Sequence, residues 1–153
     1  MDEFVKKLKA AGKLRDEKVG FIQIEGLLND ALKDIQEAKA VIKIGERSPF
    51  ILAYQSMLKT GRALLFLYNL RPADGAQHKT VIQVCETILD KKFKSLAEQF
   101  ERMRRKRNEL TYEYGGLLSR AEVEAALHDA EIWIHAIAAK VKEKNPQFEF
   151  KFI

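Results

Sequence analysis

Cysteine, long apolar runs and the motifs of common enzymes are scarce in this sequence, and each scarcity excludes a class of protein. Cys85 is the single cysteine among 153 residues, so no disulfide can form within the chain. The longest apolar run, Ala63–Tyr68, is far shorter than the roughly 20 residues that a membrane-spanning helix requires. The acidic start at Asp2 and Glu3 is unlike a secretory signal. We therefore expect a cytoplasmic protein without membrane spans.

Metal and cofactor motifs are missing as well. The sequence contains no glycine-rich phosphate loop, and no Ser, His and Asp residues are spaced so that helices could assemble them into a catalytic triad. His128 and His135 are seven residues apart on one helix face, but no Cys or carboxylate pair completes a zinc site beside them, and His78 is distant in sequence. We expect neither a metal nor a cofactor.

Apolar residues make up 46% of the chain and charged residues 32%, a balance typical of a globular protein. A chain of this length buries roughly 70% of its unfolded surface in a single core. No segment is rich enough in Pro, Gly or Ser to divide the chain, so we expect residues 1–153 to form one domain.

Apolar spacings of three and four residues recur along most of the chain and predict an all-α, up-and-down bundle of about five or six helices. The N-terminal stretch predicts a short helix that Gly12 interrupts. The next helix is expected to end at Gly45, and another to begin with Ser48 as N-cap and Pro49 at its first position. It should stop before a turn at Arg71–Gly75.

Three further helices are predicted in the second half of the chain. One runs from about Gln77 to Leu89, and the next carries an apolar seam from Phe93 to Tyr114. The last begins at Ser119, whose Glu122 three residues later completes a capping box. After it, apolar and polar residues alternate through Gln147–Ile153, which predicts a strand or an extended C-terminal tail that crosses the bundle or pairs with a second subunit.

The net charge of +5 is concentrated in one helix. Between Lys91 and Arg107 only two acidic residues, Glu98 and Glu101, accompany eight basic ones. The eight are Lys91, Lys92, Lys94, Arg102, Arg104, Arg105, Lys106 and Arg107. This run is either a solvated helix face or a surface for an anionic partner such as nucleic acid, and the cluster from Arg102 to Arg107 favours the second reading.

Arg107 stands where the apolar seam of this helix calls for an apolar residue. A buried guanidinium needs a carboxylate, carbonyl groups, water or a bound ligand, because it cannot lose its proton. One alternative is an internal salt bridge with Asp34, Glu37 or Glu86, and the other is a ligand site. Helical geometry places four polar or aromatic side chains near Arg107, namely Asn108, Thr111, Tyr112 and Tyr114.

The segment Arg107–Tyr114 resembles the signature of the HEPN superfamily, in which an Arg, often followed by a polar residue, precedes a His by four to six positions. Tyr112 stands where that His is due, and Tyr114 matches a tyrosine found in some toxin members. The run Ala53–Leu65 and His78, beyond the following turn, are similar to the family's earlier helix pair. The resemblance covers about residues 48–144.

This resemblance implies a homodimer that binds RNA in a cleft between two copies of the Arg segment and, in many members, cuts it without a metal. Arg107, Asn108 and Tyr112 take the catalytic positions. A tyrosine with a pKa of about 10 is a poor base near neutral pH, so any endoribonuclease activity should be weak or lost. The predicted RNA contacts around them are Arg102, Arg104, Arg105, Lys106 and Tyr114, although Tyr114 can also be read as a core residue.

A second hypothesis follows from the same resemblance. Many such bundles are the toxin-like half of a toxin-antitoxin pair, and their partner is a small nucleotidyltransferase that in some cases modifies a tyrosine at the position of Tyr114. The chain would then be a protein-interaction module without catalysis.

Overall fold

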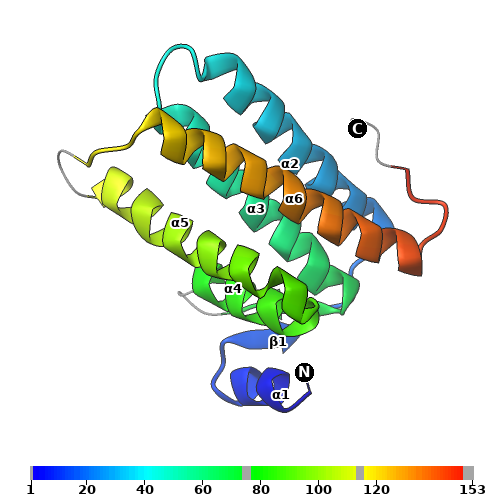
Figure 1. Cartoon of the computed structure of the whole chain (residues 1–153). Helices are drawn as coiled ribbons and strands as arrows, with labels where there is room; N and C mark the ends of the chain where they lie inside the picture. Colours follow the sequence, from blue (N-terminus) through cyan, green and yellow to red (C-terminus); the bar gives the residue numbers. More distant parts are fainter. Residues whose placement is uncertain (1, 74–76, 113–115, 150–153) are drawn as a thin grey trace.

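The helices α2 (Phe21–Val41), α3 (Arg47–Leu67) and α6 (Arg120–Lys144) lie side by side, and α4 (Gln77–Ile88) and α5 (Lys94–Tyr112) cover the other side of α3 (Figure 1). This computed structural model describes residues 2–73, 77–112 and 116–149. Within these ranges the chain also forms the helix α1 (Asp2–Ala10) and a short 3-10 turn at Lys91–Phe93. The predicted all-α bundle is confirmed.

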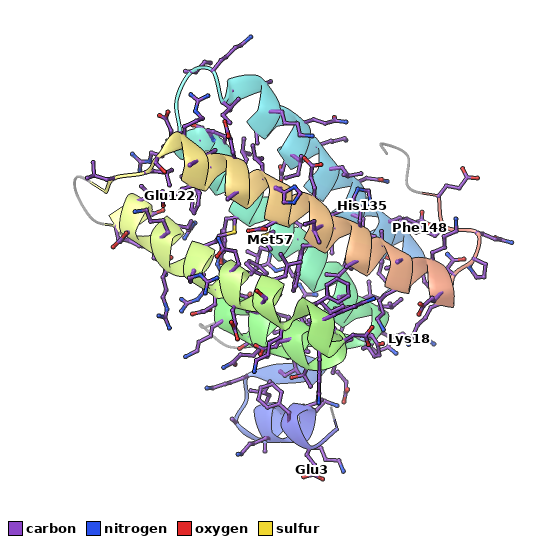
Figure 2. The ribbon with its side chains drawn as sticks, in the orientation of Figure 1. Glu3, Lys18, Met57, Glu122, His135 and Phe148 are labelled. Carbon is purple, nitrogen blue, oxygen red and sulfur yellow. The ribbon has the colours of Figure 1, made fainter. Side chains whose placement is uncertain are left out.

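The core forms around α3, because this helix contacts each of the other long helices. Tyr54 of α3, Phe100 of α5 and Trp133 of α6 stack edge to face, with ring centroids 5.6 and 5.3 Å apart. Trp133 Nε1 donates to the carbonyl of Met57, at 3.1 Å. Met57 lies inside the bundle, whereas Glu3 is exposed on α1 at the bottom of the view (Figure 2).

Two short strands were not predicted. Leu14–Asp16 (β1) pairs antiparallel with Leu70–Pro72 (β2), with Arg15 opposite Arg71. Part of the expected turn at Arg71–Gly75 is therefore a strand, and Asp74 and Gly75 lie outside the described residues. Each strand has only three residues, too few for period-two alternation to be visible in the sequence.

Two predicted helix ends were wrong. Helix α3 starts at Arg47 with Glu46 as N-cap, which places Ser48 and Pro49 inside the first turn. Proline fits there because the first N–H groups of a helix have no intrahelical partner in any case. Helix α2 ends at Val41 and is followed by a turn at residues 42–44, and Gly45 after that turn lacks the positive φ of a glycine cap.

The predictions for the two ends of the chain agree with the structure to different degrees. The short N-terminal helix is confirmed as α1, and it precedes Gly12, whose φ is 74°. At the other end Phe148 is buried, and its N–H donates to the carbonyl of Asn145 in a turn. Residues 145–149 form no strand, and the remainder of the predicted tail, residues 150–153, lies outside the described part. In the described residues no helix is both long and apolar enough to span a membrane.

Candidate functional site

Helix α5 carries the basic run and presents its apolar seam to the bundle. Its buried residues are Ala97, Phe100, Met103 and Leu110, so the predicted inward face is confirmed. Arg107 occupies the same face and is half-buried. Helical periodicity alone places it there, because it lies four residues after Met103 and three before Leu110.

Arg107 meets no carboxylate among the described residues. Its Nη1 donates to Oδ1 of the neighbouring Asn108 at 3.4 Å, a long hydrogen bond. The internal salt bridge that the sequence left open is not formed with Asp34, which pairs with Lys59 at 2.8 Å. Glu37 and Glu86 are exposed, and neither is paired with Arg107. The guanidinium therefore lies in a partly desolvated position with no counter-charge among the described residues.

Glu101 partly balances the positive charge of two neighbouring arginines, Arg104 and Arg105. Its carboxylate accepts from Arg104 in a two-pronged pair, with Nη2–Oε1 at 2.6 Å and Nε–Oε2 at 3.0 Å. Arg105 approaches the same carboxylate, with Nε–Oε1 at 3.4 Å. These hydrogen bonds, chiefly that of Arg104, lower the pKa of Glu101. Two of the predicted RNA-binding arginines thus share one counter-charge.

Of the other predicted RNA-binding residues on α5, Arg102 and Arg105 are exposed and Lys106 is half-buried. Arg102 donates to Gln99 Oε1 at 2.9 Å, and Lys106 Nζ lies 3.6 Å from Glu109 Oε2. Arg102 and Arg105 also line a groove between α4 and α5 with Lys79. The arginines of α5 therefore fall into two groups. Arg104 and Arg107 are half-buried, whereas Arg102 and Arg105 are exposed.

The structure describes one of the two tyrosines of the signature segment. The side chain of Tyr112, the last residue of α5, is 78% exposed, so its ring is open to a partner. Tyr114 lies outside the described residues.

One pair of residues near Arg107 was not predicted as part of the site. Tyr54 Oη of α3 lies 2.9 Å from Nδ1 of His78, near the start of α4. Burial is the main cause that lowers the pKa of His78, and the charges of Arg62, Arg107 and Arg104 lower it further. The sequence analysis considered His78 for a metal set and for the family resemblance, but not as a partner of Tyr54. A contact across 24 residues of sequence leaves no periodic signal in the chain.

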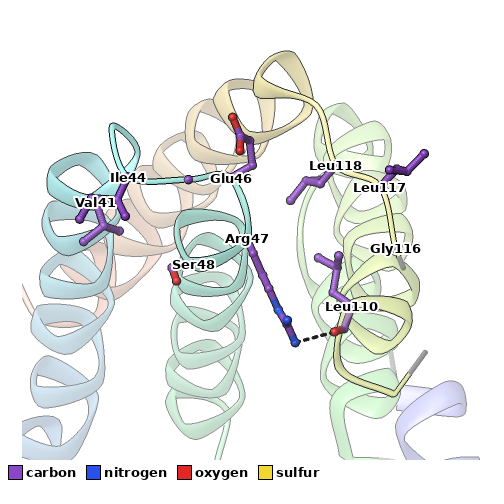
Figure 3. A pocket seen from close by; sticks show the side chains of 10 residues that line it. Val41, Ile44, Glu46, Arg47, Ser48, Leu110, Gly116, Leu117 and Leu118 are labelled. Carbon is purple, nitrogen blue, oxygen red and sulfur yellow. Dashed lines mark hydrogen bonds between the residues drawn. The ribbon is translucent and has the colours of Figure 1, made fainter. Parts of the chain in front are cut away.

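A pocket of about 600 Å³ lies at one end of α5, between the turn after α2 and the segment that joins α5 to α6. Arg47 reaches across it and donates Nη2–H to the carbonyl of Leu110 at 2.7 Å (Figure 3). This satisfies a carbonyl in the last turn of α5, which has no intrahelical partner. Ile44 and Leu117 line the pocket and are 81% and 84% exposed.

Among the described residues no group of three His, Cys, Asp or Glu side chains is placed to hold a metal ion. Comparison with known families gives one clear match, because residues 24–141 match the HEPN domain. The matched range includes α2, which the resemblance read from the sequence did not cover. No curated protein was found to match the chain.

Proposed function

The chain belongs to the HEPN domain family, and from this premise we propose that it is an RNA-binding protein that works through α5. Family membership supports a nucleotide- or RNA-related role in general. The observation that carries the narrower proposal is the state of Arg107, half-buried and without a carboxylate partner among the described residues.

Arg107 and Asn108 provide complementary groups for an RNA backbone. A guanidinium has five N–H donors in a plane and binds phosphate oxygens in pairs. In the observed contact the amide oxygen of Asn108 accepts from Arg107, so the amide NH₂ remains to donate to a phosphate oxygen or a 2′-hydroxyl. Such a pair recognises the backbone and not a particular base.

The surroundings of Arg107 fit a single-stranded partner. Arg102, Arg105 and Lys106 add positive charge along the same helix, and Arg104 adds charge that Glu101 partly balances. The exposed ring of Tyr112 offers a surface on which an unpaired base can stack. Tyr114, outside the described residues, belongs to the same proposed contact set.

Cleavage of the bound RNA is proposed to be weak or absent. By the sequence resemblance Tyr112 stands at the position of the family's His, and a phenol is a much weaker base than an imidazole near neutral pH. Arg107 and Asn108 then serve as backbone contacts.

A homodimer is part of the proposal. Ile44 and Leu117 expose most of their apolar surface beside the pocket at the end of α5. Contiguous exposed apolar patches are found at protein–protein contact sites. A second copy that covers this place would bring two α5 helices near each other.

The alternative function is that of a partner for a small nucleotidyltransferase in a toxin-antitoxin pair. The tyrosine that this alternative concerns is Tyr114, which lies outside the described residues, so the support for it is family membership. A nucleotidyltransferase reading frame next to the gene, and its co-purification with this chain, are the expected observations under this alternative.

RNA binding is tested by fluorescence anisotropy with a labelled single-stranded RNA at about 50 and 200 mM salt. We expect Arg107→Ala to weaken binding about tenfold or more and to reduce the salt dependence by about one counterion. The matched control is Arg15→Ala, an exposed arginine in β1. The proposal fails if binding does not depend on salt, or if both variants bind like the wild type.

A further inference from the structure

The last turn of α5 is held by a side chain from another helix. Arg47, the first residue of α3, extends along one wall of the pocket and donates Nη2–H to the carbonyl oxygen of Leu110 at 2.7 Å (Figure 3). The two residues are 63 positions apart in the sequence. By contrast, the polar contacts of Arg102, Arg104 and Lys106 stay within α5. Arg47 therefore links the main chain of α5 directly to α3.

The carbonyl group of Leu110 is one that its own helix leaves without a partner. Helix α5 ends at Tyr112, and the last four carbonyl groups of a helix have no intrahelical N–H to accept from. The aligned peptide dipoles also make this end negative. A guanidinium meets both needs, because it donates a hydrogen bond and carries a positive charge. Arg47 therefore opposes the fraying that is usual at a helix end.

The guanidinium of Arg47 has no carboxylate partner among the described residues. Glu46, the preceding residue, lines the same pocket, but its carboxylate is taken by Arg120, with Nη2–Oε1 at 3.3 Å. The side chain of Leu110 is buried, and Gly116 passes so close that a Cβ built on it would lie 3.1 Å from Leu110 Cδ2. Leu110 is thus held by its carbonyl group on one side and by its packed side chain on the other.

The turn that Arg47 holds carries the groups of the proposed RNA surface. In an α-helix each N–H bonds to the carbonyl four residues earlier, so the N–H groups of Thr111 and Tyr112 close the turns that begin at Arg107 and Asn108. If the last turn opened, these two bonds would be lost. The side chains of Arg107 and Asn108 would then no longer project from a fixed helix.

We propose that Arg47 is a positioning residue for the RNA surface of α5. It does not contact the RNA. It keeps the last turn of α5 closed, so that Arg107 and Asn108 are already ordered when the RNA backbone arrives. A segment that must be ordered on binding loses part of its affinity to the entropy of ordering, and a residue that orders it beforehand restores that part. This inference rests on the proposed function and adds the residue that prepares its site.

The first measurement is amide hydrogen exchange of the whole chain, followed by NMR. Arg47→Met keeps an unbranched side chain but removes the donor and the charge. We expect the amides of Thr111 and Tyr112 to exchange about tenfold faster in this variant, because the last turn opens more often. Amides in the middle of α6 should exchange as in the wild type, which shows that the bundle as a whole is intact.

Arg120→Met is the matched control. Arg120 donates to Glu46, next to Arg47 in the sequence, so this variant also removes one positive charge from the same end of the molecule. The lost contact is an exposed ion pair, and such pairs contribute little to stability. The amides of Thr111 and Tyr112 should exchange as in the wild type.

The second measurement is the anisotropy titration with labelled single-stranded RNA at about 50 and 200 mM salt. Arg47→Met is expected to weaken binding about three- to tenfold and to keep the salt dependence of the wild type. A direct contact between Arg47 and a phosphate would instead reduce the salt dependence by about one counterion. Arg120→Met should bind like the wild type.

The inference is overturned if the end of α5 exchanges at the wild-type rate in Arg47→Met, or if it exchanges faster while RNA binds with unchanged affinity. A reduced salt dependence overturns it as well, because Arg47 would then be an RNA contact. In each of these cases a loss of binding in Arg107→Ala leaves the proposed function standing. If the wild type binds no RNA, the proposed function fails and this inference fails with it.

Discussion

Gly61 lies where α3 and α4 approach too closely for a side chain. A Cβ at this position would lie 2.6 Å from Val81 Cγ1 and 3.3 Å from Cys85 Sγ. Because both neighbours are fully buried, they have little room to move. We expect Gly61→Ala to lower the free energy of unfolding by about 1–3 kcal/mol, measured by urea denaturation.

Gly26 is the matched control for this prediction. It lies within α2, and nothing would be within 4 Å of a Cβ built on it. Gly26→Ala should raise the free energy of unfolding by up to about 1 kcal/mol, because alanine restricts the unfolded chain and favours the helix. Equal destabilisation of both variants would contradict the close contact at Gly61.

The carboxyl group of Glu101 makes the free energy of unfolding depend on pH. Hydrogen bonds from Arg104 lower the pKa of its carboxyl below the ordinary value of 4.5. The unfolded chain therefore binds this proton more readily, so the stabilisation is present above about pH 4.5 and is lost as pH falls through the folded-state pKa. We expect Glu101→Gln to lose less stability than the wild type between about pH 6 and pH 3 in urea titrations.

The control for the acid titration is Glu98→Gln, on the same helix. Glu98 is exposed and forms no ion pair with the described residues. Its removal should leave the pH dependence of the wild type. If Glu98→Gln and Glu101→Gln give the same curve, the Arg104 pair does not hold the carboxylate as described.

At the scale of elements, the starts of α6 and α3 lead to different predictions for the serine found at each. Ser119 Oγ accepts from the N–H of Glu122 at 3.1 Å, and Glu122 Oε1 accepts from the Ser119 N–H at 3.3 Å. Ser119→Ala should therefore cost about 0.5–2 kcal/mol of unfolding free energy. Ser48, inside the first turn of α3, forms no such cap, so Ser48→Ala should change it by less than about 0.5 kcal/mol.

Thermal and urea unfolding of the two serine variants check this pair of expectations. A larger loss for Ser48→Ala than for Ser119→Ala would show that α3 begins where the sequence pattern places it. The capping box at Ser119 was predictable because both of its partners lie within four residues. The start of α3 was not, since a Ser-Pro pair is compatible with several positions in a first turn.

At the scale of the whole molecule, the proposed homodimer predicts how two exposed side chains behave. Leu117→Asp or Ile44→Asp should convert a dimer into a monomer in sedimentation velocity, because an aspartate in an apolar interface is desolvated without a partner. The midpoint of monomer unfolding should change little, since neither side chain belongs to the core.

Ile22→Asp is the control for the dimer. Ile22 is 84% exposed, as is Leu117, but lies near the start of α2, at the opposite end of that helix from Ile44. This variant should remain a dimer. A wild type that stays monomeric at every concentration would remove the dimer from the proposal.

Most of the bundle was predictable from the chain. Alternating spacings of three and four residues identified the long helices, and the seam of α5 identified its inner face, including Arg107. The two β-strands and the helix ends around Gly45 and Ser48 were missed. Three-residue strands are too short for a pattern, and their pairing joins segments more than 50 residues apart.

The sequence by itself determined the helices, the basic character of α5 and the place of Arg107 on its inner face, because helical period and charge are local properties. Only the tertiary structure decided that Asp34 pairs with Lys59, that Arg107 meets no carboxylate in the described part of the chain, and that Tyr54 meets His78. Each of these depends on how two helices cross. The spacing within one helix does not specify which residue of another helix it will meet.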